Sequence, residues 1–101
     1  MGMKVEKYLT DVLQQVKEIT GLEGEFAVVK NWEQGPLPVQ RCHIISVYYI
    51  DKERTTLVHR TRICSTTINN DEAYYNTFTE ALGYIIVNWE EIWNLINTKP
   101  Q

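Results

Sequence analysis

The chain lacks a hydrophobic run of membrane length. A membrane helix needs about 20 consecutive apolar residues, whereas apolar runs such as Tyr84–Val87 stop after a few residues. The first residues also lack the charged-then-apolar order of a signal peptide. The sequence therefore predicts no contact with a membrane, and a cytoplasmic location.

Glycine is scarce, and the five glycines are scattered along the 101 residues. No glycine-rich phosphate loop and no glycine-flanked nucleophile is present, so nucleotide hydrolysis and nucleophilic catalysis lack their usual sequence signals. We therefore expect a non-enzymatic protein with no cofactor.

Cysteine is also rare, with only Cys42 and Cys64. In a reducing compartment two cysteines predict buried thiols. Cys42 and His43 are neighbours on a predicted strand and point to opposite faces, while His59 and Cys64 lie about 16 Å apart along another. At most two of these four side chains can meet, whereas a structural zinc ion needs four ligands, so no metal site is expected. A Cys42–Cys64 disulfide is an alternative in one strand register.

Charge is nearly balanced, with a formal net charge of −3. This mild value implies no strong attraction of the whole molecule to nucleic acid or to a membrane. The distribution is uneven, because basic residues exceed acidic ones between Arg41 and Arg62, whereas acidic residues dominate from Asn69 onward. The two halves of the domain therefore carry opposite fields.

What the chain does contain is a clear order of patterns. Helical spacing of apolar residues opens the chain and ends at Gly21, and strand-like alternation follows. The predicted elements are helix 4–20, strands 25–32, 40–50 and 55–67, and helix 70–97. We predict a single α+β domain over residues 1–101, in which a three-stranded antiparallel sheet is covered on one face by an N-terminal helix and a long C-terminal helix.

The longest pattern is an apolar stripe that keeps one helical phase from Ala73 to Ile96. Asn69 is placed to cap the helix start, with Glu72 three residues later as in a capping box. Gly83 interrupts good helix formers, so a helix ending there, followed by a fourth strand over 84–89, is the alternative.

The strands 40–50 and 55–67 predict a long hairpin with two possible registers. An even loop places Ile44 opposite Ile63 and Tyr48 opposite His59, which gives the cleaner core; an odd loop places Cys42 opposite Cys64. In both registers Arg60 and Arg62 share one face.

The C-terminal helix suggests an interaction surface. A helix over 70–97 would be about 40 Å long and the strands about 30 Å, so its last turns should overhang the sheet. Exposed aromatic and aliphatic clusters mark interfaces. The predicted partner-binding residues are Trp32, Tyr84, Trp89, Ile92, Trp93 and Ile96. They favour a small module that self-associates, as a dimer, or binds another protein. Its size and element order resemble, in layout only, phage-encoded tail-completion proteins and inhibitors of host enzymes.

The alternative function is nucleic-acid binding through a basic sheet face. Its candidate residues are Arg41, Tyr49, Arg60 and Arg62. The element order, with Gly35-Pro36 before the second strand, resembles that of double-stranded RNA-binding domains, which would imply RNA as the partner. The basic helix start of that family is replaced here by Asn69-Asn70-Asp71-Glu72, which would repel phosphate.

Overall fold

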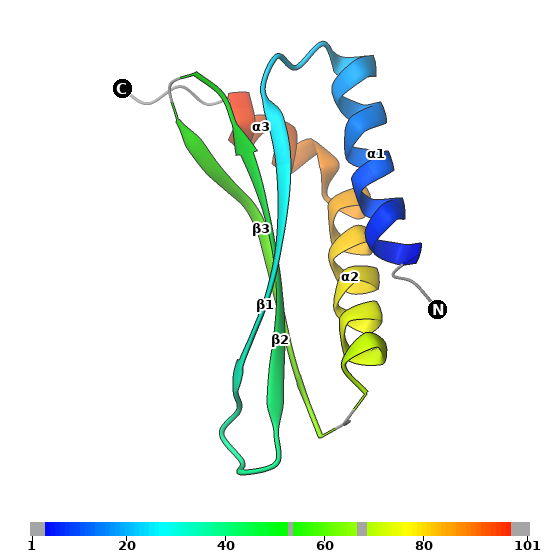
Figure 1. Ribbon diagram of the computed structural model, residues 1–101. Coiled ribbons are helices and arrows are strands. Elements are labelled where there is room, and N and C mark those ends of the chain that lie inside the picture. Colours follow the sequence, from blue (N-terminus) through cyan, green and yellow to red (C-terminus); the bar gives the residue numbers. More distant parts are fainter. Residues whose placement is uncertain (1–3, 53, 67–68, 98–101) are drawn as a thin grey trace.

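Three strands and three helices follow one another in the computed structural model, which describes residues 4–52, 54–66 and 69–97. The elements are α1 (Lys4–Thr20), β1 (Glu25–Gln34), β2 (Arg41–Ile50), β3 (Thr55–Ser65), α2 (Asn70–Val87) and α3 (Trp89–Asn97). The strands form an antiparallel sheet in the order β1-β2-β3. Both α1 and α2 lie on the same face of this sheet (Figure 1). The predicted α+β fold is confirmed.

Local signals explain where the helices begin and end. Gly21 has a φ of 73°, the left-handed conformation that closes α1 where the sequence predicted. The side chain of Asn69 accepts a hydrogen bond from the Glu72 backbone N–H at 3.2 Å, which caps the start of α2.

The long C-terminal helix is divided at Asn88 into α2 and α3, a correction to the single helix predicted over 70–97. The backbone N–H and the side-chain amide of Asn88 both donate to the Tyr84 carbonyl, at 2.9 and 3.0 Å. Asparagine competes for backbone partners in this way and favours helix ends. Gly83 stays inside α2, and residues 84–87 are helical, so the fourth-strand alternative is wrong.

The break lets α3 turn toward the end of the sheet near the β2–β3 hairpin, so the predicted overhang does not form (Figure 1). Arg54, in that hairpin, donates from its guanidinium to the carbonyls of Ile96 at 3.0 Å and Leu95 at 3.4 Å. A cation that binds the last carbonyls of a helix stabilises its negative end.

The core lies between the helices and the sheet. Phe78 of α2 is its largest fully buried side chain. Around it pack Leu9, Leu13, Ile45, Val47, Tyr49, Val58, Ala81, Ile85, Ile92 and Ile96. Tyr49 also accepts a hydrogen bond from the Gly24 N–H at 2.7 Å, and a Cβ at Gly24 would lie only 2.6 Å from the Tyr49 ring. Glycine is therefore required at this contact.

From Arg41 to Val47 the hairpin of β2 and β3 has the odd register, one of the two that the sequence leaves open, and not the even register with the cleaner apolar face. Cys42 lies opposite Cys64 and Ile44 opposite Arg62, and a β-bulge then shifts the pairing so that Tyr48 lies opposite Leu57. The bulge leaves Val58 as an extra residue of β3, and its side chain is buried in the core. The helix-facing side chains of β2 include His43, which contacts Tyr74 of α2, and the core residues Ile45, Val47 and Tyr49.

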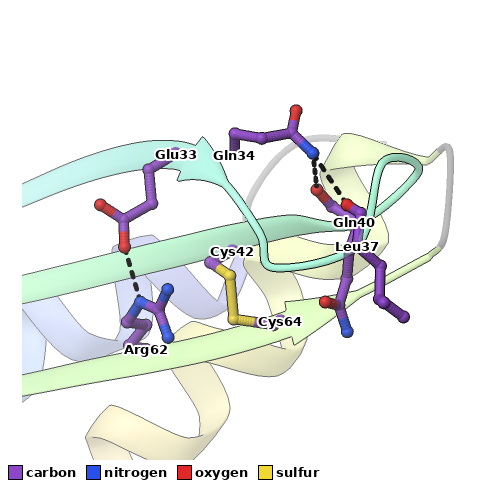
Figure 2. The surroundings of a disulfide bond; sticks show 7 residues. All are labelled: Glu33, Gln34, Leu37, Gln40, Cys42, Arg62 and Cys64. Atoms are coloured by element: carbon purple, nitrogen blue, oxygen red, sulfur yellow. Dashed lines mark hydrogen bonds and ion pairs between the residues drawn. A yellow bond between two sulfur atoms is a disulfide. The ribbon is translucent and has the colours of Figure 1, made fainter.

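A disulfide joins Cys42 and Cys64, so the prediction of two buried thiols is wrong. Figure 2 shows this bond between neighbouring strands, near the loop that connects β1 to β2. The Gln34 side chain fastens the loop by donating to the carbonyls of Leu37 and Gln40, each at 2.9 Å. This end of the sheet is thus held by a covalent bond and a hydrogen-bonded loop.

Candidate functional site

A groove runs between the outer edge of β3 and α2. Its volume is about 840 Å³, within the usual range of binding pockets. It is lined by His59, Arg60, Thr61, Ile63, Asn76, Thr79, Glu80, Gly83, Tyr84, Val87 and Asn88. Because β3 is the last strand of the sheet, this groove lies beside a strand edge that no other described strand pairs.

The groove has an aromatic wall that joins its two elements. The rings of His59 and Tyr84 stack with centroids 3.9 Å apart and planes 8° from parallel. The Nε2 atom of His59 lies 2.7 Å from the Thr61 Oγ1 atom, which orients the imidazole. Since Thr61 is itself buried, this contact fixes the wall rather than offering a reactive hydroxyl.

Burial lowers the pKa of His59 below its ordinary value, while the nearby Glu80 carboxylate opposes this by favouring the charged form. Desolvation is the larger effect. The imidazole is therefore neutral at pH 7, and the groove wall presents an uncharged stacked pair.

This lowered pKa predicts a pH-dependent stability. In the folded protein His59 takes up a proton less readily than in the unfolded chain, so the contribution of the neutral imidazole is fully present above about pH 6.5 and is lost as the pH falls below it. We expect the midpoint of chemical denaturation to decrease when the pH is lowered from about 7.5 to about 5.5. The fall should be smaller in His59→Gln, which lacks the titrating group; equal falls in both proteins would contradict the assignment.

Gly83 leaves an opening in the helical wall of the groove. A Cβ built on Gly83 would have no atom within 4 Å outside its immediate helical surroundings. Glycine inside a helix is less stable than alanine by about 1 kcal/mol, and no contact of the described residues requires it here. The missing side chain leaves room for another chain to approach α2 closely.

The opposite face of β3 is basic. Arg60 borders the groove from β3, but its position opposite Ser46, like that of Arg62 opposite Ile44, places its side chain on the sheet face away from the core residues Ile45 and Val47. The Nε atom of Arg62 is 2.6 Å from the Glu33 Oε1 atom, an ion pair that spans the central strand (Figure 2). Arg60 is exposed and has no ion-pair partner among the described residues.

The predicted partner-binding residues do not form one surface. Tyr84 lines the groove, but Ile92 and Ile96 face the core. Trp89 packs partly buried against that core, and its ring centroid lies 6.4 Å from that of Trp93.

Trp32 is separate from all of them. Trp32 lies on β1 opposite His43 of β2, toward the end of the sheet away from α3 (Figure 1). The Arg41 guanidinium lies 4.8 Å from the centroid of its ring. The break at Asn88 turns α3 toward the core, whereas Trp32 lies apart because it is near the far end of β1.

The four nucleic-acid candidates are likewise divided. Tyr49 is buried on the helix side of the sheet, and strand alternation places Arg41 on the same side. Arg60 and Arg62 lie on the other side. A single basic surface carrying an exposed Tyr49 is therefore not formed.

Sequence reasoning missed most of the groove. From the sequence, His59 is a candidate metal ligand and the residue opposite Tyr48 in one hairpin register, and Gly83 marks an alternative helix end, a kink or a close contact; Glu80 and Val87 carry no motif. The combination of an unpaired outer strand and a glycine on the adjoining helix was the available signal, but it required knowing that α2 packs beside β3.

Two further kinds of site are not seen. In residues 4–52, 54–66 and 69–97, no three His, Cys, Asp or Glu side chains gather as metal ligands. None of the described helices is long and apolar enough to cross a membrane. Comparisons with protein-family models, curated proteins and solved structures found no match.

Proposed function

We propose that the protein is a small non-enzymatic interaction module that binds another protein chain in the groove between β3 and α2. The observation that carries the proposal is the position of this groove beside the edge of β3 that no other described strand pairs. An unpaired edge strand offers backbone donors and acceptors, and binding domains use such edges to add a strand from a partner. The adjoining hollow would accept the partner's side chains.

The chemistry of the groove supports binding over catalysis. Its histidine is stacked against Tyr84, and the hydroxyl nearest to that histidine, on Thr61, is buried. A nucleophile must reach its substrate, and a catalytic site needs groups that converge on one reacting atom. The groove residues instead offer an aromatic surface and a free strand edge.

Substitution of Gly83 tests the proposal. Gly83→Ala should raise stability by about 1 kcal/mol, because alanine favours the helix and meets open space. Gly83→Gln should be at least as stable as the natural protein, since glutamine is also a good helix former. Its longer side chain projects into the groove and should abolish partner binding, whereas the alanine variant keeps most of the space.

The measurement is affinity capture from the native source by the natural protein and both variants, with thermal denaturation as the check on folding. Support requires a protein that the natural chain and Gly83→Ala retain and Gly83→Gln loses. Sedimentation of the same three proteins tests self-association. If neither capture nor self-association depends on residue 83, the groove is not the binding site.

A further inference from the structure

A strand bound at the edge of β3 would present its side chains to two different environments. Successive side chains of a strand point to opposite faces of the sheet. On the helix side they would enter the groove beside His59, Ile63 and Tyr84. On the open side they would lie next to Arg60 and Arg62.

The groove side favours apolar side chains. Tyr84 and Val87 of α2 are exposed in it, at 41% and 81% of their surface. His59 stacks flat on Tyr84, and Gly83 leaves the helix backbone uncovered between these side chains. Aliphatic side chains entering here would cover this apolar surface, which favours binding.

The open side favours acidic side chains. Arg60 has no ion-pair partner in the part of the chain that the structure describes. Arg62 forms an ion pair with Glu33 in which both side chains are exposed. Exposed ion pairs of this kind contribute little to stability. Opposite charges on directly neighbouring strands stabilise pairing, and like charges oppose it.

We infer that the partner segment is an extended strand in which acidic and apolar residues alternate, paired to β3 between the bulge at Val58 and Ser65. Its acidic residues meet Arg60 and Arg62, and its apolar residues fill the groove. This inference rests on the proposed function and adds the chemical class of the partner.

A second copy of this chain fits the same edge poorly. Two β3 strands paired edge to edge would bring Arg60 and Arg62 of both chains together on one face. Charged residues on an edge strand are a common protection against such pairing. The arginines therefore select against self-association while they attract an acidic strand.

Fluorescence anisotropy with two labelled peptides tests this inference. In one peptide glutamate alternates with valine, and in the other lysine replaces glutamate. The glutamate peptide should bind about tenfold more tightly, because two favourable cross-strand charge pairs replace two unfavourable ones. The preference should shrink at high salt and reverse for the Arg60→Glu/Arg62→Glu variant, and Gly83→Gln should weaken binding of the glutamate peptide.

Backbone amide shifts in NMR spectra locate the peptide, and the expected changes lie along β3 from His59 to Ser65. Equal affinity for the two peptides, or shifts confined to another element, would overturn the inference. Capture of a natural partner that depends on residue 83 but not on Arg60 and Arg62 would support the proposed function. It would contradict only the inference that the partner segment is acidic. Self-association that Gly83→Gln abolishes would assign the groove to a second copy, against the inference.

Discussion

Phe78→Ala is expected to lower the free energy of unfolding by about 3–5 kcal/mol. Phe78 is fully buried between the sheet and the helices. Truncation removes its apolar contacts and leaves a cavity that the packed neighbours refill only in part. Domains of this size are stable by only about 5–15 kcal/mol, so the variant should lose a large share of its stability.

Chemical denaturation monitored by tryptophan fluorescence measures this loss. The matched control is Tyr75→Ala, an aromatic truncation on the same helix at a side chain that is 53% exposed. Its effect should stay within about 0.5 kcal/mol. Equal losses in the two variants would show that α2 does not present Phe78 to the core.

Removal of the disulfide is expected to cause the second large loss of stability. Replacing both Cys42 and Cys64 with alanine should cost about 3 kcal/mol, because the bond closes a loop with a sequence separation of 22 residues and so restricts the unfolded chain. Reduction of the natural protein should cost a similar amount. For a domain of about 100 residues this lowers the melting temperature by roughly 12 °C or more.

The double variant is also the control, since a reductant should leave its melting temperature unchanged. Thiol titration gives a second test, because the oxidised protein should expose no titratable thiol even after denaturation. Two reactive thiols in the purified protein would contradict the bond. Disulfides persist in oxidising compartments, so the titration also bears on the predicted cytoplasmic location.

The outer parts of the fold were predictable because their signals are local. Gly21 ends α1, and Asn69 caps α2, through interactions within a few residues. The alternation in β1 and the polar turn between β2 and β3 were equally clear in the sequence. The element order and the sheet followed from these signals.

The register of the central strand was not predictable, because β2 is buried on both faces. Ile45 and Val47 face the helices, while Cys42 and Ile44, which point to the other face, are buried as well. A strand with apolar residues in both phases gives no preferred alternation. The bulge at Val58 shifts the phase again, and only the packed structure shows it.

The groove was beyond sequence reasoning for a related reason. Tyr84 was identified, but with a surface at the C-terminal end that the break at Asn88 turns inward. Arg60 and Arg62 were correctly placed on one face, although Tyr49 lies on the other. Long-range packing of α2 beside β3 decides which of these residues belong together.

The sheet order also has a consequence for folding kinetics. Each strand pairs with its neighbour in the sequence, so the β1–β2 and β2–β3 contacts form by closing short loops. Chains dominated by such local contacts fold faster than those that must pair distant strands. By contrast, the contact of α1 with α2 joins two helices that the whole sheet separates in the sequence, so it closes a much longer loop and costs more conformational entropy.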